Sequence, residues 1–218
     1  MKTLHTLPMV LLVVFLCGCP ATTRGPSNLR PGEMAHAASG ILFPEHVLGF
    51  ARGQIRAYDS SGRDVSVGYD LVDPQNPVVI TVYVYPAPKL TSIGSPADVV
   101  ETVRRKLTDN HFQGVKAEIM RSHPQASLLS ERQTAMQFQG QSLYGRSARF
   151  KSRERFAHRT QPVISHAEVF AFGKWLIKFR ITHPTESEDE AKHSIDEFKT
   201  AFCEANERAP NQSIQATK

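Results

Sequence analysis

Alternation of apolar and polar positions predicts three strands in the first part of the chain. In residues 63–71 every second side chain is apolar, which is the period of a half-buried strand. Residues 78–85 are apolar on both faces, so this strand is expected in the middle of a sheet that carries layers on both sides. A further strand is expected over residues 49–58, and Asp, Ser, Gly and Pro residues separate the three.

A first amphipathic helix is predicted after these strands. Ser95 is placed to cap it, and Pro96 suits the first helical position. An apolar stripe at helical spacing follows, formed by Val100, Val103 and Leu107. Gly114 is a candidate interruption, after which residues 115–121 resume the helix.

The second half of the chain predicts four strands and a second helix. Tight turns join the strands, so neighbours are expected to be antiparallel. The last helix begins in an acidic segment, residues 184–190, which matches the positive end of a helix dipole. Its apolar stripe includes Phe198 and Phe202. The four predicted strands are residues 127–138, 141–156, 163–172 and 175–182.

This order of elements predicts an α+β fold. We expect an antiparallel sheet of about six to seven strands flanked by two amphipathic helices, an αβα sandwich. The order is similar to that of the PsbP-like fold, a small αβα sandwich of accessory proteins of membrane complexes and of bacterial lipoproteins. The resemblance covers Phe43 to Asn206 and consists of element order alone, so it implies a fold and no function.

The start of the chain has the pattern of an exported leader. One positive charge at Lys2 precedes an apolar run of about ten residues, too short for the roughly twenty residues of a membrane-spanning helix. The sequence Leu16-Cys17-Gly18-Cys19 resembles the lipobox of bacterial lipoproteins. The resemblance implies cleavage before Cys19, a diacylglycerol thioether on its sulfur, and acylation, commonly with palmitate, of the new amino terminus. An ordinary secretory leader with two incidental cysteines is the alternative.

Four segments follow from these patterns. Residues 1–18 are a lipoprotein signal peptide, and residues 19–39 are the acylated cysteine and a flexible tether rich in Pro and Gly. Residues 40–207 form a single α+β domain, and residues 208–218 are a polar tail. The expected location is the bacterial cell envelope. Because Pro20 and not Asp follows the cysteine, the lipoprotein resemblance favours the periplasmic face of the outer membrane in a Gram-negative source.

One basic surface stands out within the predicted domain. Residues 149–155 alternate basic side chains with others, so a strand would align the basic ones on a single face, about 6.6 to 6.8 Å apart. We call this set the basic ladder: Arg149, Lys151, Arg153 and Arg155. It suits anionic lipid headgroups or an acidic envelope protein. The alternative is a solvated strand extension that keeps a sheet edge from aggregating.

Other candidate chemistry is sparse. The sequence carries no zinc-protease, nucleophile-elbow, phosphate-loop, dinucleotide or calcium-loop motif. His166, Glu168 and His183 could approach one another as three metal ligands, although polar residues on a partly exposed strand face are the simpler interpretation. Cys203 is the one cysteine left after the leader and Cys19, which excludes a disulfide within the monomer. It is interpreted as a buried apolar residue and not as a nucleophile.

The sequence therefore predicts a lipid-anchored envelope protein that acts as a binding or assembly-support module. Its expected partners are the membrane, through the acyl chains on Cys19, and an anionic lipid or an envelope protein. The net charge of +5 fits such partners, and the envelope location disfavours nucleic acid. We expect no catalytic residue, no cofactor and no metal. An envelope enzyme with a site assembled from distant residues, and a carrier of a lipophilic ligand, are the alternatives.

Overall fold

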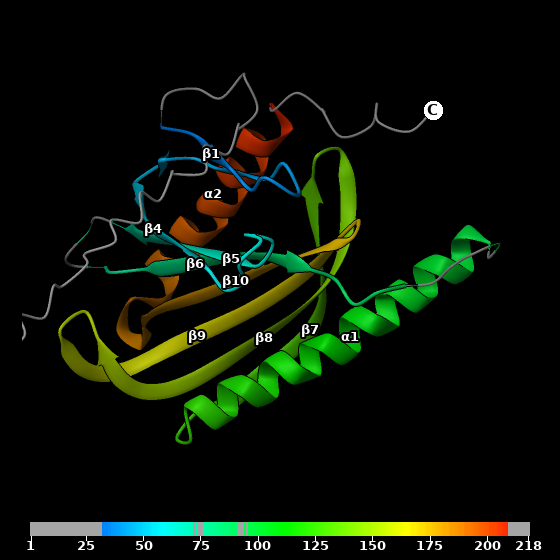
Figure 1. The fold of residues 1–218 in the computed structure, drawn as a ribbon. Helices are drawn as coiled ribbons and strands as arrows, with labels where there is room; N and C mark the ends of the chain where they lie inside the picture. The colour runs from blue at the N-terminus through cyan, green and yellow to red at the C-terminus, as the bar shows by residue number, and fades with distance from the viewer. Residues whose placement is uncertain (1–31, 72, 74–75, 91–93, 95, 209–218) are drawn as a thin grey trace, which may run out of the picture.

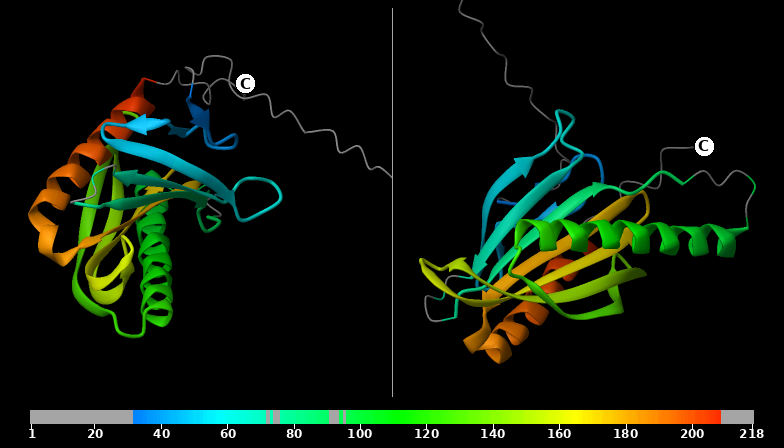
Figure 2. Two further views of the ribbon diagram at one scale, coloured as in Figure 1. Left: turned by 90° about the vertical axis from the view of Figure 1, so that its left-hand side faces the viewer. Right: turned by 90° about the horizontal axis from the view of Figure 1, so that it is seen from below.

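The computed structural model describes residues 32–71, 73, 76–90, 94 and 96–208. It consists of a large antiparallel sheet with one long helix on each face (Figure 1). The order of strands in this sheet is β3-β4-β5-β6-β10-β9-β8-β7. Figure 2 shows the two helices on opposite sides of the sheet. The eight strands are β3 (His46–Val47), β4 (Phe50–Ala57), β5 (Val65–Leu71), β6 (Val79–Pro86), β7 (Ser127–Phe138), β8 (Gln141–Phe156), β9 (Arg159–Phe172) and β10 (Trp175–Pro184).

The predicted α+β class and the order of three strands, a helix, four strands and a helix are confirmed. The sheet has eight strands and not six to seven, because the two-residue strand β3 pairs with β4. A separate pair joins β1 (Met34–Ala35) to β2 (Leu42–Phe43). The segment predicted as tether, residues 19–39, thus contains the strand β1, which pairs with residues of the predicted domain. Elements of two residues carry too little periodicity to be recognised in a sequence.

The helix α2 (Glu188–Glu207) covers one face of the sheet and follows a short turn of helix, η1 (Thr185–Ser187). Phe198 and Phe202 are fully buried, and the ring of Phe198 packs edge-on against those of Phe50 and Tyr69 at 4.9 and 5.1 Å. The side chain of Asn206 bonds to both the N–H and the carbonyl of Leu42, which fixes β2 to the end of this helix. These contacts form the larger of the two cores.

The helix α1 (Ala97–Ser122) covers only part of the opposite face. It runs unbroken through Gly114, so the expected interruption is wrong. Its buried apolar side chains, Phe112, Val115 and Ile119, pack on alanine, valine and phenylalanine side chains of β8 and β9. At 1.5 Å per residue this helix is about 39 Å long, and its first half projects beyond the sheet (Figures 1 and 2).

The first half of α1 differs from the sequence prediction. The stripe that was expected to pack on the sheet is not buried, since Val103 is 38% exposed and the first buried side chain is Thr108. Pro96 is the cap residue and not the first helical residue, while Ser95 lies outside the described residues. Helical spacing of apolar residues shows which face could pack, but only the path of the chain decides whether a sheet lies beneath it.

Candidate functional site

The basic ladder lies at the end of the hairpin formed by β8 and β9. The side chains of Lys151, Arg153 and Arg155 are exposed, whereas Ser152 on the other face of the strand is buried. The period of two that predicted a single basic face is therefore present in the structure. Arg149, the innermost member, is partly buried.

Ion pairs hold this hairpin to the start of α2. Arg149 bonds to Glu188, the first residue of α2, and Arg159, just after the hairpin turn, bonds to Glu186. The sequence had indicated only helix-dipole stabilisation for these acids. We call Lys151, Arg153 and Arg155 the three outer cations. Within the residues that the structure describes, no acidic group lies within ion-pair distance of any of them. The ladder thus has one structural arginine and three cations available to a partner.

The opposite face of the hairpin is joined to α1. Glu154 accepts a hydrogen bond from the hydroxyl of Ser152 at 2.9 Å, and its carboxylate lies 3.3 Å from Nδ1 of His123 at the end of α1. Contacts on both faces therefore fix the direction in which the three outer cations point. A rigid scaffold of this kind reduces the ordering entropy that binding would otherwise cost.

The turn of the hairpin was not recognised in the sequence. Ala157 and His158 both have positive φ values, 47° and 66°, as a two-residue turn between strands of this twist requires. Neither is Gly or Asn, so the usual signal is absent, and the predicted strand began at residue 163 instead of at Arg159. Pro162 is accommodated because β10 ends opposite Val163, which leaves this end of β9 without a second neighbour.

His166 and His183 lie together beneath the start of α2. Their Nε2 atoms are 3.2 Å apart, and Nδ1 of His183 donates to the carbonyl of Pro184 at 2.9 Å. The Nε2 atom of His183 is thus the acceptor in a neutral pair. Burial lowers the pKa of both rings, and that of His166 falls to about 3, with repulsion from His183 and Arg149 as further causes.

These histidines do not form a metal site with Glu168. The Glu168 carboxylate is bound by Lys199 of α2 at 2.6 Å, and the described part of the chain holds no group of three or more His, Cys, Asp or Glu placed to bind a metal ion. Glu168 is also almost fully buried, at 6% exposure, and not on the partly exposed face that the simpler interpretation expected for it, whereas His166 is partly exposed.

We predict that stability decreases as the pH falls below about 6.5. The folded chain binds protons to His166 and His183 less readily than the unfolded chain, whose histidines have a pKa near 6.5. The stability that these rings contribute is therefore complete above pH 6.5 and is lost as the pH falls, for His166 down to its folded pKa of about 3. Each can contribute a slope of up to about 1.4 kcal/mol per pH unit.

Unfolding measured in urea between pH 5 and 8 checks this prediction. A variant with His166→Asn and His183→Asn should show a shallower slope between pH 5 and 6.5, and above pH 7 both curves should be flat. Some slope should remain, because burial also lowers the pKa of His36 and His111. Identical slopes for the two proteins would contradict the assignment.

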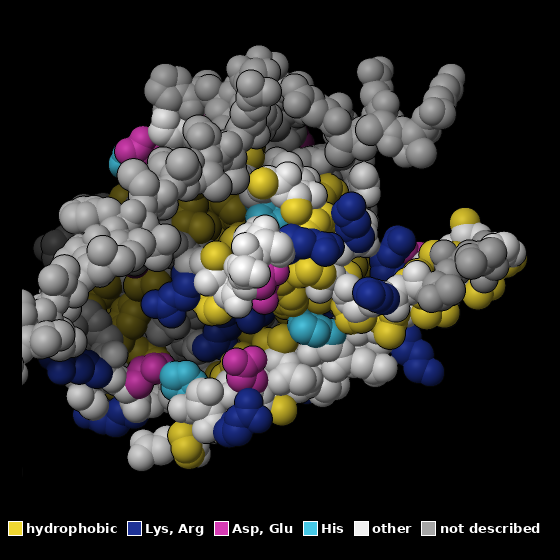
Figure 3. Space-filling view, in the orientation of Figure 1, with side chains coloured by type: hydrophobic (Ala, Val, Ile, Leu, Met, Phe, Trp, Pro, Cys, Tyr) yellow, Lys and Arg dark blue, Asp and Glu magenta, His cyan; other side chains and the backbone are white. Residues whose placement is uncertain are grey.

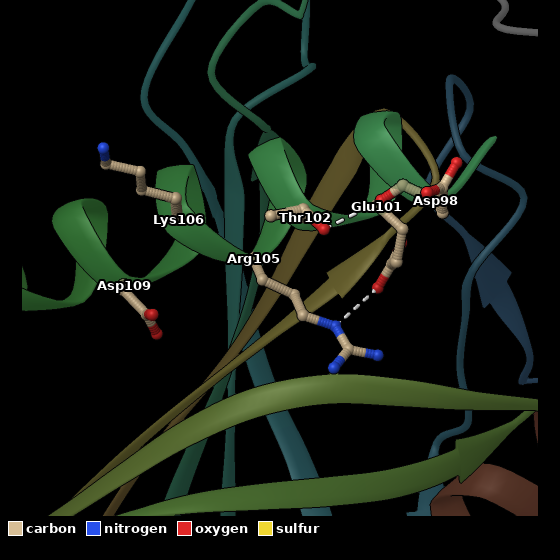
Figure 4. A pocket seen from close by; sticks show the side chains of 6 residues that line it. All are labelled: Asp98, Glu101, Thr102, Arg105, Lys106 and Asp109. Atoms are coloured by element: carbon tan, nitrogen blue, oxygen red, sulfur yellow. Dashed lines mark hydrogen bonds and ion pairs between the residues drawn. The ribbon is translucent and has the colours of Figure 1, made fainter. Parts of the chain in front are cut away.

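The hollow along the first half of α1 does not have the form of an active site. It is an open depression of about 530 Å³ lined by six side chains of this one helix (Figure 4). Arg105 pairs with Glu101 at 3.0 Å, and the hydroxyl of Thr102 bonds to the carbonyl of Asp98. These local pairs satisfy a solvated helix face, so titratable groups do not converge here on a common point.

Cys203 is 8% exposed, and burial raises the pKa of its thiol to about 11. Its thiolate is therefore scarce at neutral pH, as expected for a buried apolar residue. Cys19 lies outside the described residues. Within the described residues, no helix combines the length and the apolar character that crossing a bilayer requires.

Sequence reasoning missed a second basic cluster, on the α1 face of β10. The apolar residues of this strand suggested that neither face is solvated, yet Lys178 and Arg180 both lie on one face and are only partly buried. The signal was their spacing of two residues within an apolar strand. It has no meaning until the structure shows that α1 packs mainly on β8 and β9 and reaches β6 and β10 at Tyr85 and Leu176, so that Lys178 and Arg180 stay partly accessible.

Comparison with known proteins yields a similarity of fold. No family model and no curated protein matches the chain. A solved structure that resembles it is the solution structure of cyanobacterial PsbP (CyanoP) from Synechocystis sp. PCC 6803. The two are 18% identical, with a TM-score of 0.43 over 85% of this chain and 96% of that one. We transfer no site, partner or activity from it.

Proposed function

We propose that this protein is a lipid-anchored module of the bacterial cell envelope that binds an anionic bilayer surface through the basic ladder. The anchor is the acylated Cys19 of the lipobox-like sequence, and in a Gram-negative source the favoured site is the periplasmic face of the outer membrane. The tether would hold the domain near the bilayer, because the average distance between the ends of a flexible linker is about 5 to 6 Å times the square root of the number of residues in the linker.

The observation that carries the binding role is the set of three outer cations. Lys151, Arg153 and Arg155 are exposed and aligned on a fixed hairpin, and the described residues provide no acidic partner for them. Near an anionic membrane each such charge contributes about 1 kcal/mol. A solvated strand extension alone would not require contacts that fix the direction of the cations on both sides of the hairpin.

Two exposed leucines favour a lipid surface over an acidic protein as the partner. Leu128 and Leu129 of the edge strand β7 are 46% and 48% exposed; Leu128 pairs with Phe150 of β8, and Leu129 lies where the pairing shifts by a bulge. Exposed apolar side chains on the strand that adjoins the ladder strand match the bilayer interface, where acyl chains lie behind charged headgroups. A soluble acidic partner would offer carboxylates to the cations, but it would offer no comparable apolar layer to the leucines.

The anchor is tested by replacing Cys19. We expect Cys19→Ala to abolish labelling by fatty acids and to move the protein from the membrane to the soluble fraction, since two or three acyl chains supply the durable attachment. Cys17→Ala is the matched control: it removes a sulfur two residues away, within the leader, and should leave labelling and partitioning unchanged. Mass spectrometry that finds an unmodified thiol at Cys19 would contradict the anchor.

The binding surface is tested with vesicles and the chain from residue 20 onward, which lacks the leader and Cys19. Replacing Lys151, Arg153 and Arg155 by Gln should weaken partitioning into vesicles with anionic lipid by roughly 3 kcal/mol, or about a hundredfold. Binding of the unaltered chain should also fall steeply with salt, because the Debye length shrinks from about 10 Å at 0.1 M to about 3 Å at 1 M.

A second triple variant controls for net charge. Replacing Arg104, Arg105 and Lys106 of α1 by Gln removes the same charge at a different place, so its effect on partitioning should be small. Equal losses from the two triple variants would mean that net charge and not the ladder attracts the bilayer. Binding that stays unchanged in the ladder variant would exclude this function for the hairpin.

A further inference from the structure

The α1 face of the sheet carries two cations on one strand, on the face opposite the basic ladder. Lys178 and Arg180 are alternate residues of β10, so they project from the same face about 6.6 to 6.8 Å apart. Lys178 stands opposite Tyr83 of β6, and Arg180 stands opposite Thr81. The helix packs mainly on β8 and β9, and Figure 3 shows Lys, Arg, Asp and Glu side chains among apolar ones on the side of the molecule that carries α1.

Neither cation has an acidic partner within the described part of the chain. Arg180 and Lys178 are partly buried, yet no carboxylate there lies within ion-pair distance of either one. The Nη1 atom of Arg180 is inaccessible to solvent and has no hydrogen-bond partner among the described residues. An unpaired guanidinium N–H in such a place is costly, and because solvent does not reach Nη1, an oxyanion would bind the other nitrogens of Arg180 or displace the atoms that cover Nη1.

The charged groups around Lys178 and Arg180 do not provide the missing ion-pair partner. Burial lowers the pKa of Lys178 and of Arg180, as expected for cations with too little compensation. Glu118 of α1 acts on both groups from a distance, Asp64 adds to its effect at Lys178, and Glu154 adds to it at Arg180. These carboxylates offset part of the positive charge of the pair, but none of them lies within ion-pair distance of Lys178 or Arg180.

Aromatic side chains adjoin the cations on the same face. The Nζ atom of Lys178 lies 4.0 Å from the ring centre of Tyr83, and Tyr58 stacks on that ring at 6.3 Å. The hydroxyl of Tyr58 is fixed by Ser66 at 3.0 Å. On the other side Tyr85 bonds to His111 of α1 at 2.9 Å. The rings are therefore held in place, and a ligand that packs on Tyr83 would share the surface of that ring with Lys178 and Tyr58.

Small residues leave space beside Arg180. Thr81 stands opposite it on β6, and Gly68 of β5 stands opposite Thr81 in the same row of the sheet. A Cβ atom added at Gly68 would meet nothing within 4 Å. The row thus combines a cation that lacks a partner with open space at the neighbouring glycine and with fixed rings one row away.

From this juxtaposition we propose that Lys178 and Arg180 bind the phosphate or carboxylate group of a small organic anion, and that a ring or apolar part of the ligand packs on Tyr83. The guanidinium can donate two parallel hydrogen bonds to such a group, and the ammonium contributes a second charge. This site is separate from the basic ladder, on the other face of the sheet, and does not depend on membrane binding.

Calorimetric titration of the full chain with phenyl phosphate, benzoate and inorganic phosphate at equal ionic strength tests the proposal. We expect saturable binding of one phenyl phosphate or benzoate per chain, and weaker binding of inorganic phosphate, which cannot pack on Tyr83. Preference for phenyl phosphate or for benzoate identifies the head group. Absence of saturable binding of all three at millimolar concentration would overturn the proposal.

Variants locate the binding. Arg180→Met and Lys178→Met should each lower the affinity at least tenfold, and Arg180→Lys should lower it less because the charge remains. The ladder variant Arg153→Gln is the control and should not change it. Since removal of a buried cation can alter folding, thermal melts of each variant without ligand accompany the titrations. Binding of phenyl phosphate or benzoate that survives both Met substitutions would refute this site. Because the site does not depend on membrane binding, vesicle partitioning should be the same for Arg180→Met and the unaltered chain.

Discussion

Replacing Phe198 by alanine is expected to lower the free energy of unfolding by about 3 to 5 kcal/mol. The ring is fully buried between α2 and the sheet, where it packs edge-on against Phe50 and Tyr69 and stacks on Phe202 at 6.0 Å. Alanine would leave a cavity among aromatic rings on three elements that cannot all move in to fill it. Urea unfolding, followed by tryptophan fluorescence and circular dichroism, measures the change.

The neighbouring Glu197 provides the control for this prediction. It lies on the exposed side of the same helix, with 53% of its side chain accessible, so Glu197→Ala should change stability by no more than about 0.5 kcal/mol. A Phe198→Ala variant as stable as Glu197→Ala would show that α2 does not cover the sheet as described. Both probes should follow one transition, because both cores share the same sheet.

Removing Lys199 should destabilise the protein by a similar amount. Its ammonium lies 2.6 Å from the carboxylate of Glu168, whose side chain is only 8% exposed, while Lys199 itself is 21% exposed. The variant Lys199→Met leaves this carboxylate buried beneath α2 without its cation. Breaking a buried ion pair in this way costs about 3 to 5 kcal/mol, because the remaining charge has lost its compensation. The same urea experiment at pH 7 provides the measurement.

Two further variants separate the ion pair from the packing. In the double variant Glu168→Leu with Lys199→Met no buried charge remains, and stability should return to within about 1 kcal/mol of the unaltered chain. The exposed pair of Arg159 and Glu186, with 58% and 67% accessibility, is the matched surface control, and Arg159→Met should cost less than about 1 kcal/mol. A small effect of Lys199→Met alone would mean that water compensates Glu168 in solution.

The basic ladder shows how far a sequence predicts a surface of this kind. Its period of two was sufficient to align the four basic residues on one face of a strand. It could not show that Arg149 forms an ion pair with Glu188, 39 residues away, or that Arg159 forms one with Glu186, 27 residues away. Such pairs depend on where α2 begins relative to the hairpin, which is a property of the packed layers.

The cluster of Lys178 and Arg180 lay beyond sequence reasoning for a related reason. The apolar residues of β10 suggested that neither face of the strand is solvated, and the tyrosines of β6 add apolar character on the face that carries the two cations. Whether such a face is covered depends on where a helix lies. The position of α1 over β8 and β9 is set by Phe112, Val115 and Ile119, none of which is near β10 in the sequence.

Taken by itself, the sequence determined the seven long strands, the two helices, their order and the single basic face of the hairpin. These follow from local periodicity, which reflects how neighbouring side chains project from a strand or a helix. The tertiary structure alone decided the eighth strand, the ion pairs that use Arg149 and Arg159, the projection of the first half of α1 beyond the sheet and the incomplete burial of Lys178 and Arg180. Each of these depends on which surfaces meet, and residues far apart in the chain determine that.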